Sequence, residues 1–272
     1  MIDTVSLILL LGGGLVLGAG FSLLIRYQRQ ARRQRQALGL RLLSGLRILL
    51  ALVQQHRGLT NGYLNGSREL LAEIETVEHD VSRNFADIAR IDPVLEGDDR
   101  WQGITQHWAR LAGNYKRLES GYNLNQHNQL IKNVLLLIDA VAKRCELLLL
   151  RNQHQQPLHL YWRELLAVAE FIGQARAIGT GVAAACHCDR VSRRRLNDLC
   201  AKIRESSVRL QLQNGTADSS SSDIKQLLKC IDEQILTELP SISAPAYFAL
   251  ATQAIDSLLN QFDRLLKEQT WR

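Results

Sequence analysis

The segment Gln55-His56-Arg57-Gly58-Leu59-Thr60-Asn61-Gly62 has a counterpart later in the chain, Gln174-Ala175-Arg176-Ala177-Ile178-Gly179-Thr180-Gly181. With Arg57 aligned to Arg176, both segments follow the pattern Gln-x-Arg-(Gly/Ala)-(Leu/Ile)-x-x-Gly. Each lies in a long run with apolar residues at helical spacing, which predicts two helices. Glycine inside a helix costs roughly 1 kcal/mol relative to alanine, so it usually marks close packing or the approach of a ligand.

The two arginines allow two interpretations, because burying a guanidinium group without an anionic partner is costly. In the first, the two helices face one another and hold an anion between Arg57 and Arg176. In the second, the helices simply pack together, and the arginines extend to water or pair with a carboxylate. Structural ion pairs of that kind are common, so the sequence leaves both interpretations open. Carboxylates available for such pairs are Glu73, Glu75 and Glu170.

The composition favours an all-α fold. The 272 residues are rich in Leu, Ala, Gln and Arg, contain only four prolines, and show no run that alternates as a β-strand would. The net charge of +6 is concentrated in residues 26–35 and 190–195. Two separate basic patches indicate a membrane surface or anionic ligands at least as much as nucleic acid. A basic amphipathic helix at 190–213 more often faces solvent or a membrane, so we expect no nucleic-acid partner.

Residues 6–25 predict a transmembrane helix. They carry no charged side chain, and about twenty apolar residues suffice to cross a bilayer. No Lys or Arg precedes the run, which argues against a cleaved signal peptide, and five arginines follow it, which puts the C-terminal side in the cytoplasm. The sequence therefore predicts a single-pass protein of the bacterial inner (cell) membrane, with residues 1–36 as anchor and basic juxtamembrane segment. Gly14 and Gly18 form a small-xxx-small pair that could join two copies as a homodimer.

The rest of the chain, residues 37–272, reads as a succession of amphipathic helices. The first is expected to continue from the membrane helix with little interruption, linking Arg57 rigidly to the anchor. Ser67 is expected to cap the second helix. The first four helices make a natural bundle. The expected helices span about 37–64, 67–90, 101–120, 122–152 after a turn at Gly121, 157 to 186 or 188, 190–213, 223–236 and 246–268.

Cysteine usage and motif content predict neither a metal site nor an enzyme. Five cysteines at irregular spacing argue against an extracellular disulfide framework. Cys186-His187-Cys188 with Cys200 raises a zinc hypothesis, but Cys-x-Cys on one helix points to two faces, so we expect buried free thiols. No phosphate-binding glycine loop, dinucleotide fingerprint, zinc-protease motif or nucleophile elbow occurs. The histidines are scattered, and we expect neither catalysis nor a cofactor.

Three segments resemble motifs of the nitrate- and nitrite-sensing (NIT) domain family. Leu52–Ser67, reading LVQQHRGLTNGYLNGS, is similar to the arginine-glycine-hydrophobic-small signature of the family's first helix. Glu170–Val182, reading EFIGQARAIGTGV, resembles the second motif, which is centred on Gln-x-Arg-Ala. Ala246–Leu259, reading AYFALATQAIDSLL, resembles the closing helix. The segments occur in the family's order, whereas His56 departs from the charged residue often found beside the first arginine.

The resemblance implies an all-helical sensor of two packed four-helix bundles that binds nitrate or nitrite between helices. Carried over by motif, Arg57 and Arg176 would be the anion ligands, with Thr60, Gln55 and Gln174 as neutral donors. A planar oxyanion suits a guanidinium fork. The family's usual output modules do not appear in the sequence, so we expect signal transduction to a separate, unknown protein partner. The alternative is a membrane-tethered helical scaffold that has kept the fold and lost the ligand.

Overall fold

The computed structural model describes residues 4–152, 155–214 and 219–270, and the side chains of residues 20–152, 155–210 and 221–269. The expected all-α class is confirmed, because regular structure in these ranges is helical apart from one isolated antiparallel bridge between Arg151 and Pro157. The α-helices are α1 (Thr4–Leu64), α2 (Leu71–Ile91), α3 (Asp99–Asn114), α4 (Ser120–Arg144), α5 (Leu158–Ala185), α6 (Arg190–Asn214), α7 (Ser219–Cys230) and α8 (Ala244–Thr270). Short 3-10 helices are η1 (Arg68–Leu70), η2 (Pro93–Gly97), η3 (Tyr115–Arg117) and η4 (Leu147–Leu149), and a π-helical turn, η5 (Ile231–Ile235), follows α7.

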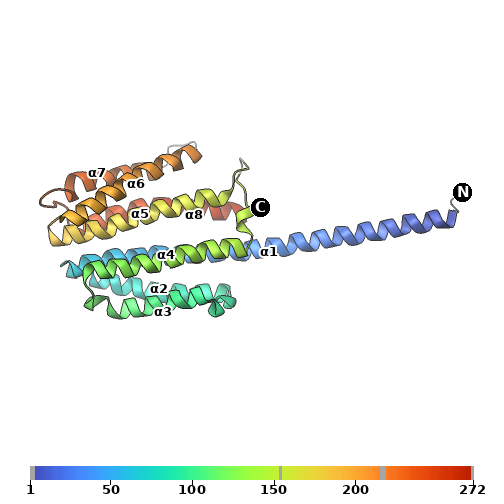
Figure 1. The fold of residues 1–272 in the computed structure, drawn as a ribbon, viewed down its shortest axis with the longest axis horizontal. Helices are drawn as coiled ribbons and strands as arrows, with labels where there is room; N and C mark the ends of the chain where they lie inside the picture. Colours follow the sequence, from blue (N-terminus) through green and yellow to red (C-terminus); the bar gives the residue numbers. More distant parts are fainter. Residues whose placement is uncertain (1–3, 153–154, 215–218, 271–272) are drawn as a thin grey trace.

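Helix α1 projects far out of the body that the other helices form (Figure 1). In the projecting part, large apolar side chains face outward, and Phe21 and Leu23 each keep 65% of their surface accessible. From Leu40 onward, the inward-facing leucines of α1 are buried. The predicted boundary between residues 36 and 37 thus lies close to the change from exposed to buried, but the helix passes through it without a break, as expected.

Two helices in the described ranges are long and apolar enough to cross a membrane, judged by length and composition alone. One is α5, and 78% of its most apolar window is buried, which is typical of a core helix. The other is α1 from Gly20 onward, half of whose window is buried. The exposed apolar residues at its projecting end make that end the candidate membrane segment. Gly14 and Gly18 lie outside the residues whose packing the structure describes.

The body consists of two groups of helices that meet along α1 and α5, a contact that we call the seam. Helix α1 contacts α2, α4, α5 and, less extensively, α8, and α3 packs against α4. Helix α5 contacts α6 and α8 in addition to α1, and α7 packs against α8. In Figure 1, α2, α3 and α4 lie on one side of the seam and α6, α7 and α8 on the other. Contacts between the two arginine segments must therefore form at the seam.

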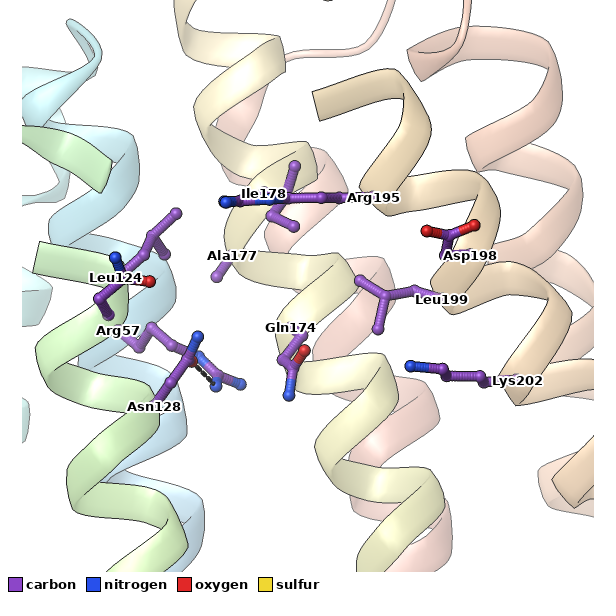
Figure 2. A pocket seen from close by; sticks show the side chains of 11 residues that line it. Arg57, Leu124, Asn128, Gln174, Ala177, Ile178, Arg195, Asp198, Leu199 and Lys202 are labelled. Carbon is purple, nitrogen blue, oxygen red and sulfur yellow. Dashed lines mark hydrogen bonds between the residues drawn. The ribbon is translucent and has the colours of Figure 1, made fainter. Parts of the chain in front are cut away.

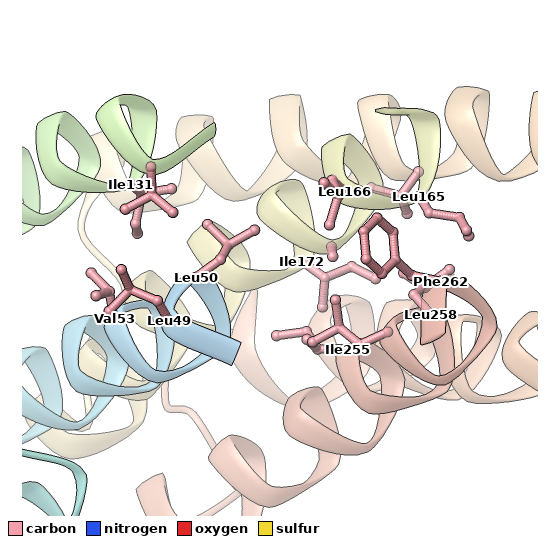
Figure 3. Packing of buried hydrophobic residues seen from close by; sticks show 14 of the residues in the cluster. Leu49, Leu50, Val53, Ile131, Leu165, Leu166, Ile172, Ile255, Leu258 and Phe262 are labelled. Carbon is pink, nitrogen blue, oxygen red and sulfur yellow. The ribbon is translucent and has the colours of Figure 1, made fainter. Parts of the chain in front are cut away.

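Buried apolar side chains from four helices form the core around the seam (Figure 3). Burying one side chain of this size contributes about 1.5–3 kcal/mol. Packing of these apolar faces, more than helix propensity, therefore holds the long helices together. The labelled members are Leu49, Leu50 and Val53 of α1, Ile131 of α4, Leu165, Leu166 and Ile172 of α5, and Ile255, Leu258 and Phe262 of α8.

Helix ends differ from the predicted ones where a cap or a left-handed residue intervenes. Ser67 makes no side-chain capping bond, contrary to expectation, and α2 begins only after the turn η1. Asp98 accepts two backbone N–H hydrogen bonds, so α3 begins at Asp99. Helix α4 ends at Arg144, earlier than predicted, because Glu146 adopts a left-handed conformation with φ of 57°.

Candidate functional site: two buried arginines and a polar cleft

Arg57 is fully buried at the seam and paired with a carboxylate. Its guanidinium group meets Glu170 of α5 in a bidentate arrangement, with Nη1 2.7 Å from Oε1 and Nη2 3.2 Å from Oε2. Nη1 also donates to Oδ1 of Asn128 on α4 at 2.6 Å. Either charge alone would be costly in this position, so the two groups depend on each other. Of the carboxylates that the sequence offered, Glu170 is the partner of Arg57.

Two glutamine amides complete the surroundings of Glu170. Gln54 Nε2 donates to Oε2 at 2.7 Å, and Gln174 Nε2 donates to Oε1 at 2.8 Å. Gln174 therefore lies beside Arg57 and Glu170. Gln55 does not take part in these bonds and is only half-buried, so Gln54 stands in the place expected for it. The reason is that residue 54 shares a helix face with residue 57, three positions on, whereas residue 55 does not.

Arg176 lies on the side of α5 that faces α8, and it is 2% exposed. Its Nη1 donates to Thr252 Oγ1 at 2.7 Å, and its guanidinium carbon lies 4.6 Å from the centre of the Phe248 ring. Among the described residues it forms no ion pair. Burial and the charge of Arg57 lower the pKa of Arg176 to about 9, against the pull of Asp256. Arg176 is thus a buried cation held by a hydroxyl group and an aromatic ring.

The two arginines influence each other, but they do not form the symmetrical clamp that the sequence suggested. Arg57 turns toward Glu170 and α4. A Cβ on the next residue, Gly58, would stand 2.7 Å from the Phe248 ring and 3.6 Å from Arg176 Nε, on the side of α8. The Nε atom of each arginine is buried without a hydrogen-bond partner among the described residues. The seam therefore holds two guanidinium groups and one hydrogen-bonded carboxylate.

Motif glycines let side chains approach the opposite helix. A Cβ on Gly173 would come within 2.8 Å of Arg57 Nη2. A Cβ on Gly179 would overlap the ring of Tyr247, whose hydroxyl donates to the carbonyl of Ala175 at 2.9 Å. Glycine in a helix can serve close packing or the approach of a ligand, and these contacts show close packing.

Thr60 serves as a link between α1 and α4. It is fully buried, its hydroxyl donates to the carbonyl of His56 at 2.7 Å, and it accepts from Asn123 Nδ2 at 3.0 Å. Thr180 repeats the first of these bonds on α5 by donating to the carbonyl of Arg176 at 2.7 Å. The Thr60 hydroxyl therefore both donates and accepts a hydrogen bond within the protein, and Thr60 does not line the cleft described next.

A polar cleft of about 270 Å³ opens between α4, α5 and α6 beside Arg57. Two residues predicted for the site, Arg57 and Gln174, line it, as do Asn128 and two cations of α6, Arg195 and Lys202. In Figure 2 the Gln174 amide lies between Arg57 and Asn128 on one side and Lys202 on the other. The remaining lining residues are Asn125 and Asp198 and the apolar Leu124, Ala177, Ile178 and Leu199.

The cleft has an excess of positive charge. Glu170 balances Arg57, whereas Arg195 and Lys202 are solvent-exposed and form no ion pair among the described residues. Asp198 offsets one of these two charges, and Arg176 adds another cation behind α5. The sequence did not predict Arg195 and Lys202 as site residues, because their place at the cleft depends on how α6 packs on α5. Their spacing of seven residues, which is two helical turns, was the signal available.

Comparison of the chain with protein-family models, with curated proteins and with solved structures finds no match. The resemblance to the NIT domain family therefore rests on the three sequence motifs and stays a prediction.

A second polar cluster adjoins Arg57. His56 Nδ1 lies 2.8 Å from Nε2 of His127 on α4, and His56 Nε2 lies 3.2 Å from Oε1 of Glu78 on α2. His127 Nδ1 lies 2.8 Å from the carbonyl oxygen of Asn123. Burial lowers the pKa of His56 although Glu78 opposes it, and burial lowers the pKa of His127 still further. In the sequence these histidines are scattered, and only the packing of α1 on α4 brings them together.

The cysteines give no metal centre. All five are free; Cys145, Cys188, Cys200 and Cys230 are buried as expected, but Cys186 is exposed. Cys186 terminates α5 with a left-handed φ of 49°, so the Cys-x-Cys pair does not lie on one helix. No group of three or more His, Cys, Asp or Glu within the described ranges is arranged to hold a metal ion.

Proposed function

We propose that this protein is a membrane-anchored sensor that binds nitrate or nitrite in the cleft between α4, α5 and α6. Arg57 and Gln174 offer donors from the floor of the cleft, and Arg195 and Lys202 attract the anion at its rim. Arg176 contributes positive potential from behind α5. A planar oxyanion suits a guanidinium fork and the amide donors beside it. The excess positive charge of the cleft favours an anion over a neutral ligand.

The meeting of Arg57 and Gln174 at one cleft carries this proposal. They come from the two similar motifs, on different helices, and they share the cleft with two cations that lack carboxylate partners among the described residues. A volume of about 270 Å³ accommodates a four-atom anion together with several waters, since one water occupies about 30 Å³.

Glu170 occupies the guanidinium fork that an oxyanion would use, so binding is an exchange of anionic partners. Nitrate in the cleft competes with Glu170 for Arg57, while Gln54 and Gln174 can continue to donate to the displaced carboxylate. Because Arg57 belongs to α1 and Glu170 to α5, the exchange loosens a tie across the seam. The ligand then shifts an equilibrium between two arrangements of these helices by its different affinity for each.

In this proposal α1 to α4 form one four-helix bundle and α5 to α8 form a second. Helix α1 crosses the bacterial inner membrane at residues 6–25, and the arginines that follow keep the body in the cytoplasm. Arg35 Nε donates to Glu146 Oε1 at 2.9 Å, which ties the juxtamembrane part of α1 to the segment after α4. A change at the seam would pass to a separate signalling protein, and two copies could associate through Gly14 and Gly18.

The Arg57–Glu170 pair also favours a second candidate function, a ligand-free helical scaffold tethered to the membrane. Glu170 already engages both terminal nitrogens of Arg57, so a protein that has lost its ligand would keep this geometry. Such a scaffold would bind partners through its surface, and its stability would not respond to nitrate.

Thermal unfolding of the full-length protein in lipid nanodiscs separates the two functions. At equal ionic strength, nitrate or nitrite should raise the unfolding midpoint relative to chloride, by the equivalent of about 2.7 kcal/mol at one hundred times Kd. The Arg195→Gln/Lys202→Gln variant should lose most of this shift. The matched Arg194→Gln/Lys225→Gln variant removes the same charge outside the cleft and should retain it. If the wild-type unfolding midpoint were the same in nitrate, nitrite and chloride, the sensor function would be contradicted and the scaffold function favoured.

A further inference from the structure

Glu78, His56 and His127 form a chain of hydrogen bonds that needs one more proton than two neutral imidazoles carry. The carbonyl oxygen of Asn123 can only accept, so His127 Nδ1 must donate to it. In a neutral ring, Nε2 of His127 then has no proton, and His56 Nδ1 must donate to it. His56 Nε2 is thereby left as a lone pair that faces a Glu78 oxygen, which also accepts.

The contact between His56 and Glu78 therefore has two states. With a third proton, His56 is an imidazolium that donates from both nitrogens and pairs with Glu78 at 3.2 Å. Without that proton, two acceptors face each other. The two histidines are fully buried and cannot move away, whereas the side chain of Glu78 is 30% exposed and can turn to water.

We propose that Glu78, His56 and His127 act as a proton-operated latch that joins α2 to α1 and α4 in mildly acidic solution and releases Glu78 in neutral solution. The latch goes beyond anion binding and would operate whether or not the cleft binds an oxyanion.

The surroundings direct the added proton to His56. Arg57 and His107 of α3 both disfavour a charge on His127, whereas Glu78 favours one on His56. Tyr115 of η3, which packs edge-on against His56, stays neutral because burial raises its pKa. Burial lowers the pKa of His56, so the third proton binds on the acid side of pH 6.5.

The latch is adjacent to the proposed anion site on two helices. On α1, His56 precedes Arg57, and on α4 their respective partners His127 and Asn128 are also consecutive. Proton uptake therefore fixes α1 against α2 and α4 at the level where Arg57 meets Asn128. Through this contact, pH can influence the same seam that the anion would loosen.

Trp108 is a built-in reporter for the latch. Its ring centre lies 4.8 Å from that of His56 in an edge-on arrangement. Because a charged imidazole quenches the emission of a neighbouring indole, protonation of His56 should dim Trp108. The experiment is a fluorescence titration of the full-length protein in lipid nanodiscs between pH 7.5 and 5. The signal of Trp108 is the difference between wild type and Trp108→Phe, and it should fall with a midpoint below pH 6.5.

Two matched variants then test the role of Glu78. Glu78→Gln should move the midpoint to lower pH by roughly half a unit to one unit, because the imidazolium loses its carboxylate partner. Glu73→Gln removes the same charge from an exposed position of α2 and should leave the midpoint unchanged. The latch would be overturned by the lack of any transition that depends on Trp108, or by equal shifts in both variants.

Discussion

Arg57 Nη1 and Glu170 Oε1 lie 2.7 Å apart at the seam where the two groups of helices meet. The side chain of Arg57 is fully buried and that of Glu170 is 11% exposed. One residue belongs to the helix that projects from the body, and the other belongs to the helix that packs against α6 and α8. Together with the Arg47–Asp263 ion pair between α1 and α8, this pair is therefore a polar tie between the helix that carries the candidate membrane anchor and the C-terminal half of the chain.

Replacing only one of the two paired residues should strongly destabilise the folded protein. Arg57→Gln leaves a buried carboxylate without its cation, which costs about 3–5 kcal/mol. In Arg57→Gln/Glu170→Gln no charge remains, so the double variant should be more stable than the single one. Urea unfolding of the full-length protein in detergent measures both. Arg163→Gln, which breaks an exposed pair with Asp139, is the control and should cost less than about 1 kcal/mol. A cost for Arg57→Gln as small as the control's would contradict a buried tie.

Two glycine substitutions should have opposite signs. Gly179→Ala places a Cβ in the space of the Tyr247 ring and should lower the unfolding free energy by about 1–3 kcal/mol. Gly103→Ala lies in the interior of α3 with open space around it and should raise the unfolding free energy by about 0.4–1 kcal/mol. Urea unfolding gives the free energy of unfolding of both variants. Stabilisation by Gly179→Ala would disprove the close approach of Tyr247.

Acid should destabilise the folded protein through His56 and His127. Burial lowers both folded-state pKa values below the ordinary value of 6.5. At a pH between the folded-state pKa of either histidine and 6.5, the unfolded chain binds more protons than the folded one. The stability that is present above pH 6.5 is therefore lost as the pH falls. Each histidine can contribute up to about 1.4 kcal/mol per pH unit. Unfolding free energies at pH 7.5, 6.5 and 5.5 should show this slope, and His127→Gln should make it shallower. An unchanged slope in that variant would exclude His127 as a source.

Arg176→Met should stabilise the protein while weakening anion binding. The substitution removes a buried cation that has no ion pair among the described residues, so the desolvation cost of that charge disappears and the unfolding free energy should rise. Thr252 would still donate to the carbonyl of Phe248, so its hydroxyl would not be left without a bond. Urea unfolding and nitrate titration of the same sample give both quantities. Destabilisation with unchanged affinity would make Arg176 a structural residue only.

Helical periodicity predicted the fold class and most of the helices, because apolar faces must be buried in any packing of these segments. The same periodicity bears on the placement of two of the predicted site residues. Gln54, and not Gln55, shares a face with Arg57. Gln174 and Arg176 are two residues apart on α5 and so point to different sides, which explains why only Gln174 lines the cleft.

The rest depended on tertiary contacts that local sequence does not encode. The sequence offers several carboxylates as partners of Arg57, and the packing of α5 on α1 makes Glu170 the one that pairs with it. His56 and His127 are far apart in the chain, and nothing near either one indicates the other. The early end of α4 follows from a left-handed Glu146, a residue type without strong preference for that conformation.

Calorimetric titration of nitrate and nitrite into the full-length protein in lipid nanodiscs, with chloride as reference, tests most directly whether Arg57 binds an oxyanion. Arg57→Lys is the informative variant, because it keeps the positive charge beside Glu170 but loses the planar fork. We predict saturable heat with wild type and at least tenfold weaker binding with Arg57→Lys, while Arg163→Lys, on the exposed pair with Asp139, binds like wild type. No saturable heat with wild type, or equal affinity in wild type and Arg57→Lys, would contradict the account.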